Sequence, residues 1–330
     1  MKVLFIGGTG LISEAVTKLA VEQGIDLYVF NRGERQQFVP AGANVLIGDV
    51  RDKESVRKAI EGHHFDVVVN WIAFTADHVL QDIELFSGRV GQYIFISSAS
   101  AYQKPVSHYL VTESTPLANP FWAYSRDKIA CERVLMDEYR ANGFPVTIVR
   151  PSFTYGNTMI PAALNSWAMP WSLVDRMRSG KPIIVHGDGT SLWTMTHNSD
   201  FAKGFVGLLG HMQAVGHAFH ITSDEVLTWD QIYTAIGRAA GVEPNLVHIS
   251  SEFICRLHPE ETGGLFGDKA VSVVFDNSKI KRFVPGFQAT IPFAEGIRRS
   301  VSWLEQRPEL CKVDAEWNDK IDRIISAHSQ

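Results

Sequence analysis

Cysteine is scarce in this sequence. Among 330 residues there are three, Cys131, Cys255 and Cys311, and they lie far apart. An odd number at such wide spacing excludes a disulfide framework and the paired spacing of zinc-binding cysteines, so we expect reduced thiols in a cytoplasmic protein. No apolar run reaches membrane-spanning length, and we expect no membrane partner. We also expect no signal peptide, because Met1 and Lys2 lead directly into a strand pattern.

An excess of positive charge is missing as well. The formal net charge is -5, with 45% hydrophobic and 20% charged residues, as is typical of a soluble globular protein. Binding to nucleic acid needs a basic stripe, so we expect no nucleic-acid partner. We expect no metal site either, since the pair His63-His64 has no third ligand at metal spacing.

Strand and helix patterns alternate over the first 151 residues. Strands that alternate with helices imply right-handed crossovers. The pattern therefore predicts an α/β fold of the Rossmann type, a doubly wound parallel sheet. The predicted strands are 2–6, 26–31, 43–49, 65–71, 91–98 and 145–151, and the predicted helices are 11–23, 53–61, 76–88 and 122–142.

The alternation becomes less regular after Pro151. We predict a dinucleotide-binding domain over residues 1–155 and a smaller, mainly substrate-binding lobe over residues 156–330. Later segments such as 182–223 are candidates to join the first domain. The predicted later helices are 172–179, 228–240, 292–306 and a surface helix within 312–330, and the predicted later strands are 182–187 and 218–223.

A glycine-rich turn connects the first strand to the first helix. Gly7, Gly10 and Ser13 have GxxGxxS spacing. A pyrophosphate binds to backbone N–H groups at a helix N-terminus, and the backbone can approach it only where Cβ atoms are absent. Gly7 would permit the tight turn, Gly10 the close approach and Ser13 close packing of the helix. This context favours a dinucleotide cofactor over a simple turn.

The residues at the end of the second strand indicate which dinucleotide the protein binds. Asn31 stands where an NAD enzyme usually has a carboxylate for the ribose 2′-hydroxyl, and Arg32 follows. Because a guanidinium binds phosphate oxygens, this favours NADP over NAD, although Arg32 can also be read as a solvated turn residue. Asp49, after the third strand, either contacts the adenine or caps the next helix.

A serine, a tyrosine and a lysine form the candidate catalytic group. Ser98 lies at the end of a predicted strand, and Tyr124 and Lys128 are one turn apart on a predicted helix. A lysine ammonium beside a phenol lowers the phenol pKa. Tyr124 could then exchange a proton with a substrate hydroxyl while Ser98 binds the substrate oxygen.

These stretches resemble the extended short-chain dehydrogenase/reductase family, which includes nucleotide-sugar epimerases and dehydratases. The resemblance implies that Tyr124 is the acid/base and that Lys128 also holds the nicotinamide ribose. It implies a homodimer formed through helices 76–88 and 122–142. It further implies cofactor contacts by Thr9, Leu11, Ile12, Val50, Ala73 and Pro151. The matching motifs are GGTGLIS (7–13), GDV (48–50), SSASAY (97–102), YSRDK (124–128), RPSFTYG (150–156), VHGDG (185–189) and HNSDFA (197–202).

Two departures from the family pattern narrow the expected chemistry. Ala99 and Ser100 replace the Asp-Glu pair of 4,6-dehydratases, so dehydration is not expected. Trp193 and Thr194 replace the Arg-Asp pair that nucleotide-sugar enzymes carry, which argues against a nucleotide-sugar substrate. Trp193 either stacks on a sugar or apolar ring or packs in the interior.

Further candidate contacts come from the lobe and from the loop after Ser98. Ser100 is a candidate substrate contact, and His197 is either a substrate contact or a buried hydrogen-bonded residue. The remaining candidates are loop residues His108, Tyr109 and Glu113, a pocket or subunit contact by Trp122, a helix cap at Asp276, and an anion contact by Lys269 or Lys279.

The sequence thus predicts an NAD(P)-dependent oxidoreductase or epimerase. It would transfer a hydride at a secondary alcohol or ketone of a sugar-like or polyol small molecule, with Tyr124 moving the proton. The alternative is a dinucleotide-binding sensor or RNA-associated relative without turnover. The substrate, and the choice between epimerase and dehydrogenase, are left open.

Overall fold

The computed structural model describes residues 1–330. Its centre is a sheet of seven parallel strands in the order β12-β7-β5-β4-β1-β2-β3. This confirms the predicted doubly wound sheet. The strands are β1 (Lys2–Ile6), β2 (Asp26–Asn31), β3 (Asn44–Ile47), β4 (Val67–Asn70), β5 (Gln92–Ile96), β7 (Val146–Pro151) and β12 (Ala218–Ile221).

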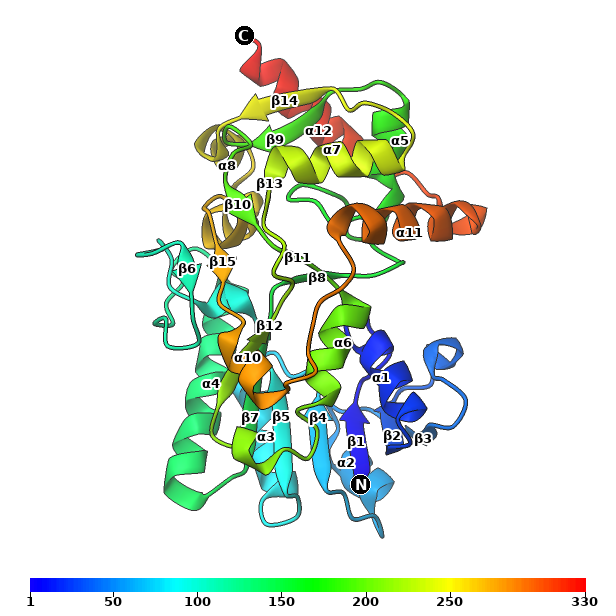
Figure 1. Cartoon of the computed structure of the whole chain (residues 1–330), viewed down its shortest axis with the longest axis vertical. Coiled ribbons are helices and arrows are strands. Elements are labelled where there is room, and N and C mark those ends of the chain that lie inside the picture. The colour runs from blue at the N-terminus through cyan, green and yellow to red at the C-terminus, as the bar shows by residue number, and fades with distance from the viewer.

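Helices cover both faces of this sheet (Figure 1). Side chains of β1 alternate between the two apolar clusters: Val3 and Phe5 pack under α1 and α6, whereas Leu4 and Ile6 face the helices on the other side. Successive side chains of a strand point to opposite faces of the sheet, and both faces are covered by helices. Both faces of such a strand are therefore apolar, which explains the continuous hydrophobic runs in the sequence. The helices are α1 (Ser13–Glu22), α2 (Lys53–Ile60), α3 (Ala76–Phe86), α4 (Ala123–Asn142) and α6 (Asn198–Val206).

A second lobe lies beyond the carboxyl ends of the sheet strands (Figure 1). It has its own apolar core, in which Trp193, Trp229 and Tyr155 are buried. Its main elements are α5 (Trp171–Arg178), β9 (Ile183–His186), α7 (Trp229–Ala239), β14 (Leu246–Ile249), α8 (Ser251–Leu257), α11 (Phe293–Glu305) and α12 (Ala315–His328).

The range 182–223 is divided between the two parts. β12 and α6 belong to the main sheet and its cover, whereas β9 pairs with β14 in the second lobe. Three further short strand pairs lie outside the main sheet: β6 (Leu110–Val111) with β15 (Val274–Phe275), β8 (Phe153–Tyr155) with β11 (Met195–His197), and β10 (Leu192–Trp193) with β13 (Leu227–Thr228).

The remaining helix α10 (Ser278–Phe283) follows β15, and a π-helical turn occupies Leu265–Lys269 after the short helix α9 (Thr262–Gly264). No helix combines the length and the apolar composition needed to cross the hydrocarbon layer of a membrane.

Candidate active site

The glycine-rich turn adopts a conformation that only glycine tolerates well. Gly7 and Gly8 have φ of +93° and +103°, where a side chain would be strained. A Cβ on Gly7 would also lie 3.2 Å from the Cβ of Trp71. The Gly10 N–H donates to the Ser13 hydroxyl (2.9 Å), and α1 begins at that serine. The turn therefore brings bare backbone to the start of α1.

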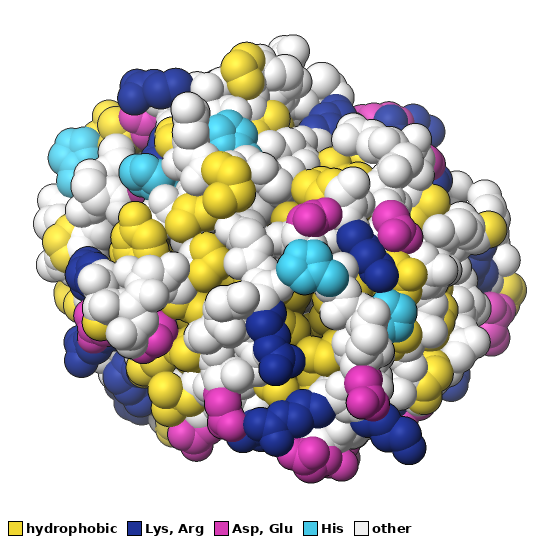
Figure 2. All heavy atoms as spheres, turned by 90° about the horizontal axis from the view of Figure 1, so that it is seen from below, with side chains coloured by type: hydrophobic (Ala, Val, Ile, Leu, Met, Phe, Trp, Pro, Cys, Tyr) yellow, Lys and Arg dark blue, Asp and Glu magenta, His cyan; other side chains and the backbone are white.

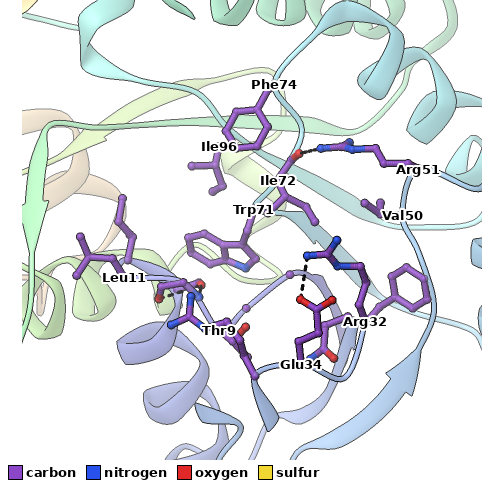
Figure 3. Close-up of a pocket in the computed structure, with 18 of the residues that line it drawn as sticks. Thr9, Leu11, Arg32, Glu34, Val50, Arg51, Trp71, Ile72, Phe74 and Ile96 are labelled. Carbon is purple, nitrogen blue, oxygen red and sulfur yellow. Dashed lines mark hydrogen bonds and ion pairs between the residues drawn. The ribbon is translucent and has the colours of Figure 1, made fainter. Parts of the chain in front are cut away.

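A cavity of about 690 Å³ opens above this turn (Figure 3). Nine of the predicted cofactor contacts line it, namely Gly7, Thr9, Gly10, Leu11, Ile12, Asn31, Arg32, Asp49 and Val50. Two predicted contacts, Ala73 and Pro151, do not line it. Their chain neighbours Ile72, Phe74 and Ser152 do.

Three buried polar atoms of the cavity residues have no partner within the chain. They are the side-chain amide Nδ2 of Asn31, the indole Nε1 of Trp71 and the hydroxyl of Ser152. Buried donors normally have partners, so a ligand with acceptor oxygens fits this cavity. The sequence interpretation missed Trp71, which it placed inside a strand; β4 ends at Asn70, and the indole lies across the cavity in Figure 3.

Charged groups surround the cavity where β2 ends. Arg32 pairs with Glu34 at 3.1 Å and both side chains are exposed. Arg35 and Arg51 line the same region. The side chain of Asp49 accepts from the backbone N–H of Arg51, whereas Asp52 caps α2. The capping alternative for Asp49 is therefore wrong.

Tyr124 and Lys128 lie in the first turns of α4, adjoining one end of the cavity. The Lys128 ammonium donates to the backbone carbonyls of Ala73 (2.6 Å) and Ile96 (2.7 Å). It lies 4.6 Å from the ring centre of Phe74 and 5.8 Å from that of Tyr124. Neither residue lines the cavity itself, but Lys128 contacts Ile96 and Phe74, which do.

The predicted lowering of the Tyr124 pKa is not seen in this structure. Burial raises the pKa of Tyr124, and the Ser98 hydroxyl offsets this only in part by hydrogen bonding. Burial also lowers the pKa of Lys128 to about 8. The reason is desolvation: both groups lie in a dry environment, and the ammonium is held by two carbonyls rather than by the phenol.

Ser98 begins a short chain of hydroxyl groups. Its oxygen is 2.8 Å from that of Ser100, which also accepts from the Ser125 hydroxyl at 2.7 Å. Ser100 is only 2% exposed, so it positions Ser98 and is not a direct substrate contact. The next residue back, Ser97, donates to the buried carboxylate of Glu132.

For Trp193 and His197 the structure favours the alternative of a buried, packed residue over that of a substrate contact. Trp193 is 2% exposed and packs against Trp229 with ring centres 5.7 Å apart, so it cannot stack on a ligand here. His197 is buried and its Nδ1 accepts from the N–H of Ser199, which caps α6. Burial lowers the pKa of His197 to about 4 and keeps it neutral. Both are structural residues in this conformation.

One aromatic residue that sequence reasoning missed, Trp167, lines the cavity. It is 70% exposed and stacks on Phe153 with ring centres 6.2 Å apart. Trp122 packs within its own chain, its ring 5.0 Å from that of Tyr124 and against Gly263. The rings of His108 and Tyr109, both exposed, stack on each other.

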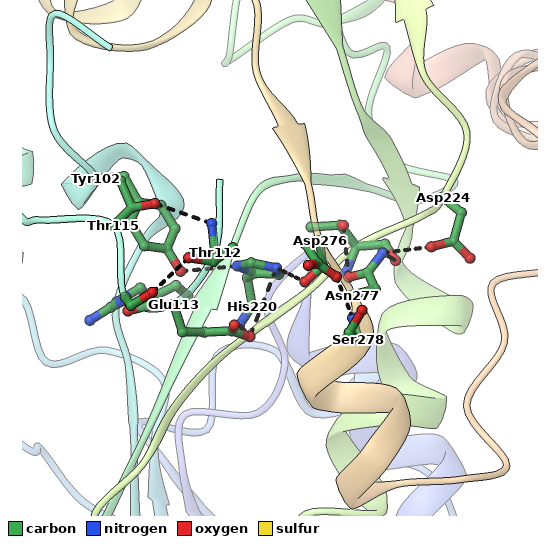
Figure 4. A network of polar contacts seen from close by, with 12 residues as sticks. Tyr102, Thr112, Glu113, Thr115, His220, Asp224, Asp276, Asn277 and Ser278 are labelled. Carbon is green, nitrogen blue, oxygen red and sulfur yellow. Dashed lines mark hydrogen bonds and ion pairs between the residues drawn. The ribbon is translucent and has the colours of Figure 1, made fainter. Parts of the chain in front are cut away.

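A buried polar network ties the sheet edge to the segment before α10 (Figure 4). The Tyr102 hydroxyl bonds to His220, whose other ring nitrogen is 2.8 Å from the Asp276 carbonyl. Glu113, expected as a loop residue beside the cleft, is buried here and accepts from the backbone N–H of His220. The Asp276 side chain accepts from the Ser278 N–H, although Asn277 is the cap residue of α10.

The parallel sheet, the glycine turn and the cavity at its carboxyl edge define a Rossmann-type α/β protein. The sequence profile described as "NAD dependent epimerase/dehydratase family" matches residues 3–87 and 80–222. The chain belongs to this family, whose members bind NAD(P).

Similar proteins have diverse names. The chain is 27% identical to the chloroplast stem-loop binding protein of 41 kDa b from Arabidopsis thaliana, over 75% of this chain and 65% of that protein. It is 23% identical to 2'-dehydrokanamycin reductase from Streptomyces kanamyceticus, over 87% of this chain and 80% of that protein. The chain thus spans just under two thirds of the first of these.

Solved structures share the fold. The UDP-glucose 4-epimerase of Thermus thermophilus, in complex with NAD, has a TM-score of 0.73 at 19% identity, covering 93% of this chain and 100% of that one. The epimerase Mth375 of Methanothermobacter thermautotrophicus has a TM-score of 0.76 at 16% identity, covering 94% of both chains.

Proposed function

We propose that this protein is an NAD(P)-dependent oxidoreductase or epimerase that acts at a secondary alcohol or ketone of a sugar-like small molecule. The observation that supports the proposal is that the Lys128 ammonium donates to the carbonyl of Ile96, which lines the cavity, while Tyr124 lies one turn away on the same helix and shares a hydrogen bond with Ser98. A bound nicotinamide supplies the hydride acceptor or donor. Tyr124 moves the hydroxyl proton, and Ser98 orients the substrate oxygen.

Removal of the catalytic phenol tests the proposal. Purified protein is screened with sugars, polyols and their keto forms while the absorbance of reduced nicotinamide is followed. Tyr124→Phe should lose activity by about 10²–10⁴-fold, the range for general acid–base catalysis. Tyr139→Phe, at the other end of the same helix α4, is the matched control and should keep full activity. Equal rates in the two variants would remove Tyr124 from the mechanism.

NADP is the preferred cofactor in this proposal. Arg32 and Arg35 both line the cavity near the end of β2, and Asn31 supplies no carboxylate to accept from a ribose hydroxyl. Arg32→Ala should weaken NADP⁺ binding by at least about tenfold, as expected for the loss of a hydrogen bond to a charged group, and leave NAD⁺ binding nearly unchanged. A fall of the same size for both dinucleotides would contradict the selectivity argument.

The homodimer is also part of the proposal. α3 and α4 pack side by side, and α3 presents Leu80 with half of its surface exposed. Leu80→Glu should shift the protein toward monomer in light scattering. A monomeric wild-type protein would contradict this.

A non-catalytic role is the second candidate, because a stem-loop binding protein is among the relatives. The face seen in Figure 2 carries Lys and Arg side chains intermixed with Asp and Glu, rather than one basic patch. Tight binding of an RNA stem-loop by a protein that turns over no alcohol or ketone would favour this candidate.

A further inference from the structure

A tryptophan stands at the start of the helix that carries the candidate acid/base. Trp122 is the N-cap residue of α4, with an extended backbone and no side-chain hydrogen bond to the helix. Small polar residues are preferred at this position because their side-chain oxygens accept from the first free N–H groups of the helix. An indole cannot accept such a bond. The residue therefore breaks a local rule of helix formation, which directs attention to what its ring contacts.

The indole packs against the ring of the candidate acid/base. The ring centres of Trp122 and Tyr124 are 5.0 Å apart and the rings are tilted by 48°, within the range of attractive aromatic pairs. The Lys269 ammonium, which pairs with Asp268 at 2.9 Å, lies 5.8 Å from the centre of the indole ring. At this distance a cation–π attraction also holds the indole. The indole therefore limits where the phenol ring of Tyr124 can lie.

Two glycines of the second lobe make room for this indole. A Cβ on Gly263 would lie 2.7 Å from the Cγ of Trp122, and a Cβ on Gly267 would lie 3.0 Å from the Trp122 Cβ. Neither glycine has a positive φ, so the backbone conformation does not require glycine at these positions. An added Cβ on Gly264, which lies between them in the chain, would have nothing within 4 Å. The close approach of Trp122 therefore accounts for the two missing side chains.

The same segment of the second lobe is bonded to the serine loop. The side-chain amide of Asn119 donates to the carbonyl of Gly267 (2.7 Å) and to that of Ser100 (2.8 Å). The Ser100 hydroxyl is in turn 2.8 Å from that of Ser98. Gly267 lies within the π-helical turn, a rare conformation that is frequent at functional sites. One segment thus contacts the supports of both the candidate acid/base and Ser98.

We propose that Trp122 is a positioning residue for Tyr124, and that the space left by Gly263 and Gly267 fixes the indole and, through it, the phenol during proton transfer. The inference rests on the proposed function, because Tyr124 needs a fixed position only if it moves a proton. A displacement of a reacting group by about 1 Å can cost about 10²-fold in rate. Neither Trp122 nor the two glycines line the cavity, so dinucleotide binding does not depend on them.

The first test measures the surroundings of Tyr124 without turnover. The protein is labelled with fluorotyrosine and saturated with NADP⁺, and the fluorine resonance that disappears in Tyr124→Phe belongs to Tyr124. Gly263→Ala should shift this resonance, because the added methyl group displaces the indole. Gly264→Ala, at the next residue of the same helix α9 and with free space around its Cβ, is the matched control and should leave the resonance in place. An unshifted resonance in Gly263→Ala would overturn the proposal.

The second test is a double-mutant cycle on turnover of a compound that the wild type converts. Gly263→Ala and Trp122→Ala should each lower kcat by at least about tenfold and up to about 10²-fold, with little change in KM or in NADP⁺ affinity. Because the glycine acts through the indole, Gly263→Ala should cause no further loss in protein that already carries Trp122→Ala. Gly264→Ala should keep the wild-type kcat. Unchanged NADP⁺ affinity shows that a variant has kept its fold.

Two kinetic results would also overturn the proposal: an unchanged kcat in Trp122→Ala, or an equal loss from Gly263→Ala with and without the indole. In both cases the loss of activity in Tyr124→Phe would remain, and the proposed function would stand. If the wild type converts no alcohol or ketone at all, the proposed function is rejected and the positioning role of Trp122 with it.

Discussion

Asp82 offers a quantitative test of how the cavity wall is supported. Its carboxylate is buried in α3 and accepts from the Tyr93 hydroxyl (2.5 Å) and the Asn70 amide (2.6 Å). The Asn70 oxygen in turn accepts from the N–H of Ile72 (2.9 Å), which lines the cavity. Burial raises the pKa of Asp82 from 3.8 to about 6. This acid is therefore more easily protonated in the folded protein.

The sign of the effect follows from proton binding in the two states. Below pH 3.8 the carboxyl is protonated whether the chain is folded or unfolded, and its contribution to stability is complete. Between 3.8 and about 6 the unfolded chain releases the proton first, so stability is lost as the pH rises. At 1.36 kcal/mol per unit, the loss amounts to about 3 kcal/mol by neutral pH.

Asp82→Asn removes this titration. We expect the stability of the variant relative to the wild type to rise by about 2.4 kcal/mol between pH 4 and pH 7, because about 0.6 kcal/mol of the total is already lost at pH 4, measured by urea unfolding at both pH values. Any fixed cost of the new amide cancels in this difference. Asp77→Asn, an exposed residue of the same helix, is the control and should show no such change. The same difference at both pH values for Asp82→Asn would refute the reasoning.

Three further predictions concern the turn, the ion pair behind the serines and the cavity indole. Gly8→Ala should cost about 1–2 kcal/mol, because φ is +103°, and should weaken dinucleotide binding; Gly24→Ala, with φ of +76° in open space, should cost a similar amount and leave binding intact in a titration. Glu132→Gln leaves the buried Arg150 guanidinium, bound at 2.6 and 2.9 Å, without its counterion, and should lower the free energy of unfolding by about 3–5 kcal/mol. The control is Glu138→Gln, at a partly exposed residue of the same helix, which should lower the free energy of unfolding by under about 0.5 kcal/mol. Equal losses of unfolding free energy in the two variants would contradict the argument. The fluorescence of Trp71 should change on NADP⁺ binding because its unpartnered Nε1 lines the cavity. If Trp71→Phe showed the same fluorescence change on NADP⁺ binding as the wild type, the ligand would bind elsewhere.

The regular part of the fold could be predicted because its signals are local. Buried parallel strands are continuous apolar runs, and α4 places Tyr124 and Lys128 on one face by their spacing alone. The two- and three-residue strands β6, β8, β10, β11, β13 and β15 have no periodicity to detect. Their partners lie far away in the sequence, so only the folded chain defines them.

The misjudged site residues share a different cause. Trp193 was assigned by its position after a turn, but a tryptophan in a strand gives no signal of which side it faces, and here it faces the lobe core. The direction of the Tyr124 pKa depends on burial, which requires the tertiary structure. Trp167 lies in an irregular segment where no pattern predicts its contact with the cavity.

The edge position of β12 has a consequence for synthesis of the chain. The strand that completes the sheet, Ala218–Ile221, pairs with β7, which ends at Pro151. α6, which packs on α1, also comes late, and its Asn198 amide bonds to the Leu11 carbonyl in the glycine turn. While the ribosome makes the residues between them, β7 has an open edge and α1 lacks its cover. Such edges pair with foreign strands, so nascent chains stalled before residue 218 should depend on chaperones more than longer ones do.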